Sequence, residues 1–249
     1  MRFFKVAGAV VLVLFACTAV QAAPITFFGE DLNTGETTRL ASTPNADAAN
    51  AAFLAALSGV GTEDFESYAN NTNLPLAISF AGSSGSITAT LSGSGFIQDL
   101  PGTGTSAGRY PISGTKYLQN VNAGSSGDAL TITFSTAVAA FGFYGTDFGD
   151  FNGVTELKLT NGTTETVSIG NSTNIAGGAA LFFGVIDTTH TFDQITFRNT
   201  NPSGGDFFGF DDMTVGDLQQ VVVPVPPAAG LGFALLAGLG ILRLRRRKN

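Results

Sequence analysis

The sequence has few of the residue types that carry redox and metal chemistry. Its 249 residues include no tryptophan, one cysteine, one histidine and two methionines, and 12% of them are charged. Cys17 lies in an apolar N-terminal run, so the rest of the chain has no thiol for a disulfide, an iron–sulfur cluster or a cysteine-based zinc site. His190 alone excludes a histidine-rich metal centre. The low charge also excludes a coiled coil and a highly charged disordered chain.

Basic residues are few and are concentrated at the two ends of the chain. Twelve Lys and Arg face nineteen Asp and Glu, which gives a formal net charge of −7. Seven of the twelve lie in segments 2–5 and 243–248, so five remain against all nineteen acids and the middle of the chain carries −14. Such a surface repels nucleic acid and anionic lipid and favours cations. We therefore expect no nucleic-acid partner.

Residues 1–22 have the features of a secretory signal peptide. Two positive charges within the first five residues precede an apolar stretch, and small residues occupy the end of the segment. We expect a signal peptidase to cut after Ala22. The run Leu14–Cys17 also resembles a lipobox, but the bulky Phe15 disfavours a lipoprotein.

Residues 221–249 form a second distinctive segment. A stiff, proline-containing piece leads into an uncharged apolar run from Ala228 to Leu242, and a basic cluster follows. The apolar run predicts a transmembrane helix, and the basic cluster predicts a cytoplasmic end by the positive-inside rule. A helix of this length is short for a bilayer. Two interpretations therefore stay open, namely a plain membrane anchor and a removable sorting segment.

This C-terminal segment resembles the PEP-CTERM sorting segment, specifically its VPLPA-like variant, which occurs on exported proteins of polysaccharide-producing Gram-negative bacteria. The matching proline motif and basic tail are Val223, Pro224, Val225, Pro226, Pro227, Arg245, Arg246 and Arg247. The resemblance implies recognition by an exosortase, a membrane peptidase that cuts near the proline motif. It also implies an inner-membrane-anchored intermediate and final placement at the cell surface or in the extracellular matrix.

Residues 23–220 predict one all-β domain with an early helix. The helix is expected at about residues 43–58, where apolar residues recur at helical spacing. Thr43 can cap this helix, Pro44 suits its first turn, and Gly59 stops it.

Nine short runs rich in Thr, Val, Ile and Phe alternate with Gly, Ser, Asn and Asp. The strands that they predict are 78–80, 86–92, 130–134, 137–144, 155–160, 165–169, 180–186, 192–198 and 207–215. Asn161–Gly162 predicts a tight hairpin. Many short strands with few helices predict an antiparallel β-sandwich that is jelly-roll-like, with phenylalanine filling the space between the sheets.

The middle of the chain also resembles a β-rich ectodomain that recurs among proteins with this sorting segment. The matching stretches are 51–54 followed by 61–66, then 108–111, 141–147 and 208–215. The resemblance implies no enzymatic activity. The opening and closing strands also resemble those of carbohydrate-binding jelly rolls, in which a structural calcium ties the two strand ends together.

Carboxylates provide two candidate calcium sites, since calcium takes six to eight oxygen ligands. The first joins acids of the opening strand to acids of the closing strand, and its residues are Glu63, Asp64, Glu66, Asp211 and Asp212. The second is the turn 147–153, approached by Asp206. The alternative is that these acids occupy turns and face solvent.

A formal G-x-S-x-G motif at residues 104–108 is followed by Asp147 and His190 in hydrolase order. A nucleophile elbow needs a buried strand before the serine and a helix after it. Here a loop precedes Ser106, and Arg109 leads into a proline instead of a helix. We therefore expect no enzyme, and we expect His190 to be a surface residue at a strand edge.

The expected function is that of a non-enzymatic, exported surface or matrix protein. The alternative is a calcium-stabilised carbohydrate-binding module that contacts extracellular polysaccharide. Exposed aromatic rings would form its sugar platform, and the candidates are Tyr68, Tyr110, Tyr117 and Tyr144. Packing in the core or in loops is the competing interpretation for each tyrosine.

Overall fold

The structure is a computed structural model, and it describes most of the segment between the two terminal regions. The described residues are 23–100, 104–121, 127–149, 154–172, 177–200 and 206–222. The predicted signal peptide and all residues of the predicted sorting motif lie outside them. Among the described residues, no helix has the length and the apolar composition that crossing a bilayer requires.

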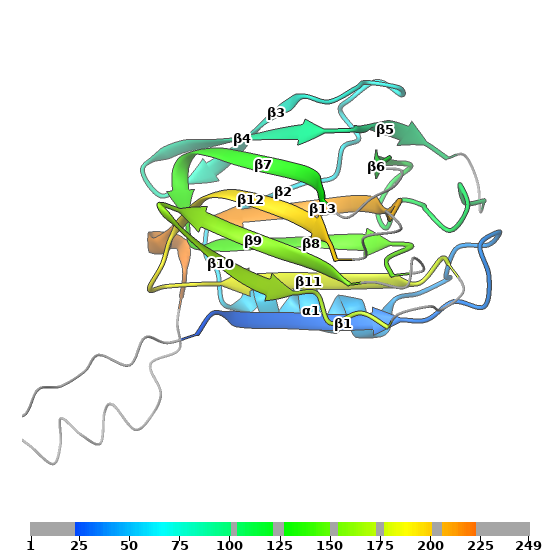
Figure 1. Cartoon of the computed structure of the whole chain (residues 1–249), viewed down its shortest axis with the longest axis horizontal. Helices are drawn as coiled ribbons and strands as arrows, with labels where there is room; N and C mark the ends of the chain where they lie inside the picture. Colours follow the sequence, from blue (N-terminus) through cyan, green and yellow to red (C-terminus); the bar gives the residue numbers. More distant parts are fainter. Residues whose placement is uncertain are drawn as a thin grey trace, which may run out of the picture.

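The described residues form two antiparallel sheets and one helix, which confirms the predicted sandwich (Figure 1). The first sheet has the order β1–β11–β8–β13–β6–β5, with β2 paired to β13. Its strands are β1 (Ile25–Asp31), β2 (Gly61–Glu63), β5 (Gly95–Asp99), β6 (Lys116–Asn120), β8 (Ala140–Thr146), β11 (Ala180–Ile186) and β13 (Gly209–Gly216).

The second sheet has the order β10–β9–β12–β7–β4–β3. Its strands are β3 (Leu76–Gly82), β4 (Gly85–Gly93), β7 (Gly127–Val138), β9 (Thr155–Asn161), β10 (Thr163–Ser168) and β12 (Phe192–Asn199). Most consecutive strands lie in opposite sheets, as in a jelly roll. All nine predicted strands are present, and the predicted hairpin joins β9 to β10 with Gly162 at φ +72°.

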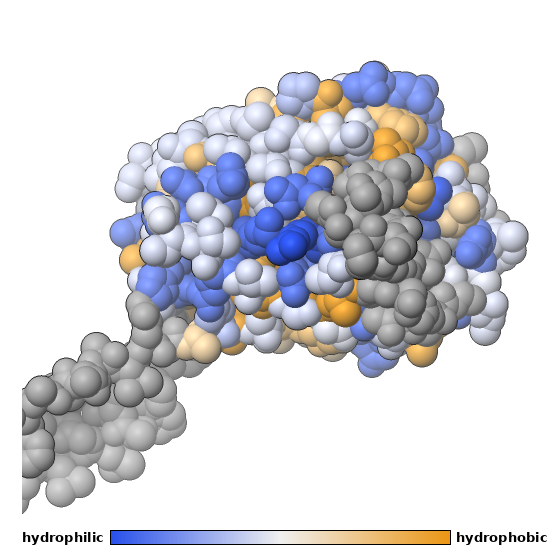
Figure 2. Space-filling view, viewed as in Figure 1, coloured by the Kyte–Doolittle hydropathy of each residue, from blue (hydrophilic) through white to orange (hydrophobic). Residues whose placement is uncertain are grey.

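Phenylalanine fills the space between the sheets, as the sequence predicts. The Phe143 and Phe210 rings stack with centroids 4.9 Å apart, and the Phe148 and Phe208 rings stack at 4.3 Å. Each of these side chains is at most 2% exposed. Burying such rings stabilises the fold by roughly 2–3 kcal/mol each, before conformational entropy is subtracted. The outward face of the second sheet is mainly hydrophilic to neutral (Figure 2), so this sheet has its continuous apolar face inside.

The helix α1 (Pro44–Ala55) packs on the outer face of the first sheet, against β1 and β11 (Figure 1). Phe53 is its main anchor and is fully buried. Two glycines of the sheet make room for this ring, because a Cβ at Gly142 or Gly184 would lie 2.7 Å from it. A second, smaller apolar core therefore lies between the helix and the sheet.

The N-terminus of α1 is capped differently from the prediction. Thr43 directs its hydroxyl to Asp47 Oδ1 at 3.0 Å and makes no cap hydrogen bond to the backbone. Instead, Asp31 at the end of β1 accepts hydrogen bonds from the backbone amides of Asn45 (3.0 Å) and Ala46 (2.9 Å). A carboxylate at this position also interacts favourably with the helix dipole.

The strand register defines two ends of the sandwich. Ile25 pairs with Ile186, and Ala140 pairs with both Ile186 and Gly216. The described chain therefore enters β1 and leaves β13 at the same end, on the left in Figure 1. We call this the terminal end. The opposite end, where β1 and β8 finish, carries the longer connections, and we call it the loop end.

Candidate functional site

The closing strand places Asp211 inside the protein, where it holds a loop. Its side chain is 1% exposed. Asp211 Oδ2 accepts hydrogen bonds from the backbone amides of Ile112 (2.7 Å) and Ser113 (3.1 Å), and Oδ1 accepts one from the Asp212 amide (2.8 Å). Burial and the Asp212 charge raise the pKa of Asp211 well above its ordinary value, although these amides oppose the rise.

Glu66 lies in the turn after β2 and not in an opening strand as predicted, because β1 and α1 precede it in the domain. It binds the same loop a few residues later. Its Oε1 accepts hydrogen bonds from the amides of Thr115 (2.6 Å) and Lys116 (2.5 Å). Desolvation alone would raise the pKa of Glu66, but these amides outweigh it and lower the pKa. Gly114 lies at φ +54°, and a Cβ there would be 2.4 Å from Glu66 Oε1, so the close approach requires glycine.

Three of the five predicted acids, Glu66, Asp211 and Asp212, therefore converge on segment 112–116 and accept hydrogen bonds from it, whereas Glu63 and Asp64 accept the amides of Phe65 and Glu66 in their own turn. Asp212 Oδ1 accepts one from the Ser113 hydroxyl at 2.8 Å. Burial raises the pKa of Asp212, and the nearby charges of Asp64 and Glu66 raise it further. Burial likewise raises the pKa of Glu63. The mutual repulsion that motivates the calcium prediction is present, and calcium binding by Glu63, Glu66, Asp211 and Asp212 stays a prediction.

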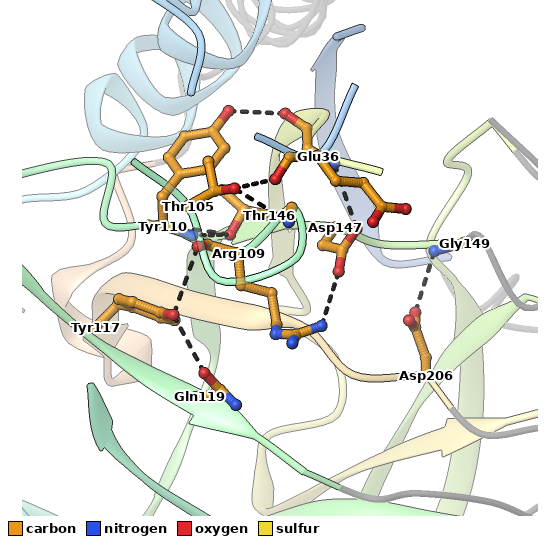
Figure 3. A network of polar contacts seen from close by, with 12 residues as sticks. Glu36, Thr105, Arg109, Tyr110, Tyr117, Gln119, Thr146, Asp147, Gly149 and Asp206 are labelled. Atoms are coloured by element: carbon orange, nitrogen blue, oxygen red, sulfur yellow. Dashed lines mark hydrogen bonds and ion pairs between the residues drawn. The ribbon is translucent and has the colours of Figure 1, made fainter. Parts of the chain in front are cut away.

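The second predicted group is divided between different partners (Figure 3). Asp147, at φ +65°, forms an ion pair with Arg109 at 3.0 Å, and its other oxygen accepts the Gly178 amide at 3.3 Å. Asp206 instead accepts the Gly149 amide at 3.1 Å. The rest of this turn, residues 150–153, lies outside the described residues. The guanidinium already neutralises Asp147, which disfavours a cation at that carboxylate.

Three of the four tyrosines are buried, which contradicts the sugar-platform hypothesis and confirms core or loop packing for them. Tyr110, Tyr117 and Tyr144 are at most 4% exposed. Their hydroxyls are held by internal partners, such as Gly178 O for Tyr110 (2.9 Å). Burial raises the pKa of Tyr110 to about 12 and that of Tyr117 and Tyr144 further. Tyr68 is partly buried against the main core.

Ser106, Asp147 and His190 do not form a catalytic triad. Ser106 lies in a tight turn closed by two backbone hydrogen bonds to Arg109, and no helix follows it. Asp147 is at one end of β11 and His190 follows the other end. The seven residues of β11 span about 20 Å. The rejection of the hydrolase motif is therefore confirmed, as is the exposed position of His190, whose side chain is 44% exposed.

A different group brings together side chains that can hold a metal ion. The ligand atoms of Glu165, Asp187 and His190 all lie within 4.8 Å of one another. In the described part of the chain, no other set of three or more Asp, Glu, His or Cys side chains meets this condition. The three residues line a cavity of about 310 Å³ at the terminal end.

The two sheets supply this group jointly. Glu165 lies on β10, the edge strand of the second sheet, on the same face as Val167, which packs against the main core. Asp187 and His190 lie in the connection from β11 to β12. Asp187 Oδ1 accepts the His190 amide at 2.8 Å, and Asp187 Oδ2 lies 3.6 Å from His190 Nδ1.

This donor set differs from the predicted one in its chemistry. One imidazole with two carboxylates suits zinc or manganese, whereas an all-oxygen set suits calcium. The spacing Asp187–x–x–His190 directly after a strand is the signal in the sequence that could have indicated this group. Glu165 could not be added to this pair from the sequence, because it reaches them only through the packing of the two sheets.

Comparison with known proteins identifies no family. No protein-family model matches the chain, and no curated protein sequence matches it. Among solved structures, the chain distantly resembles the K2 cleaved adhesin domain of Lys-gingipain, with a TM-score of 0.37 and 13% identity over 63% of this chain and 97% of that domain. We take no conclusion from a likeness at this level.

Proposed function

We propose that this chain is a non-enzymatic surface protein that a sorting system delivers. A signal peptidase removes its signal peptide, and the C-terminal helix holds it in the inner membrane. An exosortase then transfers it to the cell surface or the extracellular matrix. The observation that carries this proposal is the order of segments in the sequence: signal peptide, β domain, proline motif, apolar run and basic tail.

The geometry of the sandwich supports this proposal. β1 begins and β13 finishes at the terminal end (Figure 1). The segments that precede and follow the domain therefore attach on the same side. Val222, the last described residue, is held there by a hydrogen bond from its amide to Ala56 O at 2.8 Å. A domain held at this end presents the loop end to its surroundings, and such loops commonly carry the binding function.

A calcium-stabilised carbohydrate-binding module is the second candidate. The observation that favours it is the placement of Asp64 and Glu66 near Asp212, where their charges raise the pKa of Asp212 and a divalent cation would offset the repulsion. The buried tyrosines weigh against an aromatic platform for sugar. Recognition of polysaccharide would then depend on polar groups at the loop end.

Intact-mass measurement of the mature protein from its host tests the sorting proposal. We expect loss of residues 1–22 and of the tail beyond the proline motif. Replacing Pro224 and Pro226 by alanine should leave the tail attached, whereas the matched control Pro202→Ala should be processed normally. A surface form that still carries the basic cluster 243–248 would contradict exosortase processing and favour a plain anchor.

A further inference from the structure

The terminal-end cavity of about 310 Å³ lies where the edge strand β10 of one sheet meets the β11–β12 connection of the other. Glu165 and Asp187 line this cavity together with His190. Among the described residues that line it, none is a lysine or an arginine. Within the described ranges, no ion pair joins either acid to a lysine or an arginine. The cavity therefore has two acids whose charges no basic side chain of the described protein neutralises, which favours a cation.

The Asp187 carboxylate is fixed in one orientation. Its Oδ1 accepts three hydrogen bonds of 2.8 Å, from the Thr189 amide, the His190 amide and the Thr189 hydroxyl. These donors hold Oδ1 in the turn, and Oδ2 lies 3.6 Å from Nδ1 of the His190 imidazole. Hydrogen bonds to a ligating carboxylate orient it for a metal ion. Asp187 therefore has the support that a metal ligand needs.

The separation of 3.6 Å between Asp187 Oδ2 and His190 Nδ1 suits two ligands of one ion. It is longer than an N–H···O hydrogen bond, whose length is about 2.7–3.2 Å. Zinc holds nitrogen and oxygen ligands at about 2.0–2.2 Å in a tetrahedron, so neighbouring ligand atoms lie roughly 3.3–3.6 Å apart. A zinc ion between these two atoms therefore requires little movement of either side chain.

Glu165 supplies the third ligand from the opposite sheet. It pairs with Leu159 across the β9–β10 hairpin, so its side chain is on the face of the second sheet that packs inward. Its ligand atom lies within 4.8 Å of those of Asp187 and His190. Glu165 is partly buried and its side chain has several rotatable bonds. A small rotation therefore brings its carboxylate to coordination distance.

The donor types determine which ion this group selects. Two carboxylates and a neutral imidazole together balance the charge of a divalent cation. Imidazole nitrogen favours zinc and its neighbours among the transition metals, whereas calcium takes six to eight oxygen ligands. Zinc is commonly held by three protein ligands with water in the fourth position. The His190 side chain is 44% exposed, so the ion and its water can reach the group from solvent.

We propose that Glu165, Asp187 and His190 bind a zinc ion, with water as the fourth ligand, and that this ion fastens β10 to the β11–β12 connection of the opposite sheet. In the described sheets β10 pairs with β9 alone, so its other edge is not held by a strand. The site shares no residue with the predicted calcium ligands, and it does not depend on exosortase processing.

Calorimetric titration of the full-length, detergent-solubilised protein with zinc and with manganese tests this proposal. The protein carries Cys17→Ser, so that its lone thiol cannot bind zinc, and every buffer contains millimolar calcium to occupy the predicted calcium ligands. We expect one zinc ion per chain, bound at least tenfold more tightly than manganese. His190→Ala and Glu165→Gln should each weaken zinc binding at least tenfold. The matched control Glu156→Gln removes the same charge from the outward face of the β9–β10 hairpin and should leave zinc binding unchanged.

A spectroscopic measurement separates direct coordination from a general effect of charge. His190 is the one histidine of the chain, so isotope-labelled histidine gives the NMR signals of a single imidazole. Zinc should shift the ring nitrogen signals and slow the amide hydrogen exchange of β10, and calcium should do neither. No zinc binding by the wild-type protein, or imidazole signals that zinc leaves unchanged, would overturn the proposal. Equal losses in Glu165→Gln and Glu156→Gln, or displacement of zinc by millimolar calcium, would also overturn it.

Discussion

The two ends of the sandwich satisfy their buried carboxylates in different ways. At the terminal end, Asp217 accepts hydrogen bonds from the backbone amides of Ser83 (2.7 Å) and Gln219 (3.0 Å), and Gln220 donates to Gly59 O (2.7 Å). At this end, neutral backbone amides therefore satisfy the Asp217 carboxylate. At the loop end backbone amides also bind Asp31 and Asp206, but a guanidinium, that of Arg109, pairs with Asp147.

This difference separates structural from ligand-directed charges. A carboxylate that accepts several backbone amides is already stabilised, so it holds a loop whether or not a ligand is present. Glu66, Asp211 and Asp217 belong to this class. Charged side chains that line a cavity form the other class, to which Glu165, Asp187 and His190 belong.

The largest expected effect is at the loop end. Asp147→Ala leaves the Arg109 guanidinium buried without its partner, which should destabilise the protein by about 3–5 kcal/mol. Urea unfolding measures this loss. The control is Asp128→Ala, which removes the exposed partner of Lys158 and should cost under about 1 kcal/mol. Similar losses of unfolding free energy in the two variants would show that the buried Arg109–Asp147 pair contributes no more to stability than the exposed Lys158–Asp128 pair.

Calcium should give the next largest effect and should distinguish the two acidic groups. A cation that binds the native state stabilises it by about 2.7 kcal/mol at a hundredfold excess over its dissociation constant. We expect thermal melts to rise by several degrees in millimolar calcium over EDTA, and Asp212→Asn to remove the rise. His190→Ala is the control and should retain it. Loss of the rise in His190→Ala alone would move the cation to the terminal-end cavity.

The Asp217 cap at the terminal end should contribute less to the free energy of unfolding than the two preceding features. Asp217→Ala removes the carboxylate that caps the short helix 218–220, at a cost of about 1–2 kcal/mol. Desolvation would raise the pKa of Asp217, but hydrogen bonds from Ser83 and the helix lower it. Its contribution is therefore complete above the unfolded-state pKa and is lost as pH falls through the lowered folded-state pKa. Unfolding curves of the variant and the wild type should converge at acid pH.

The smallest expected effect is a stabilisation of the folded state, by a substitution at Asp212. Burial and neighbouring acids raise the pKa of Asp212, so its ionised form destabilises the folded state. Asp212→Asn keeps an acceptor for Ser113 and should stabilise the calcium-free protein at neutral pH by under about 1 kcal/mol. The gain should disappear as pH falls below the unfolded-state pKa. A destabilised variant at neutral pH would show that the repulsion is already screened.

Most of the fold follows from the sequence, and the missed strands explain the remainder. The runs at 155–160, 180–186 and 192–198 have the residue types and turn signals of strands, and they became β9, β11 and β12. The strands β5 and β6 are five residues long and mix polar with apolar residues, so they give no periodic signal. The strand β2 has three residues, and β1 is a partly exposed edge strand without regular alternation.

The candidate sites are less predictable, because each depends on how loops and sheets pack together. The sequence selects Asp211 and Glu66 as calcium ligands, and this role stays a prediction. Their hydrogen bonds to segment 112–116 could not be anticipated, since nothing in the sequence shows that this loop passes between them. The group of Glu165 and His190 depends on the packing of the two sheets, which brings β10 of one sheet close to the connection that follows β11 of the other.

Labelling of single cysteines on whole cells tests most directly whether the loop end faces outward. The only natural cysteine, Cys17, lies in the predicted signal peptide. Thr34→Cys places an exposed thiol at the loop end, and Thr188→Cys places one at the terminal end beside Asp187. A large, membrane-impermeant maleimide should label intact cells of the Thr34→Cys strain, and it should label those of the Thr188→Cys strain much more slowly. Labelling of either thiol only after lysis, or faster labelling at the terminal end, would contradict a surface domain that presents its loop end.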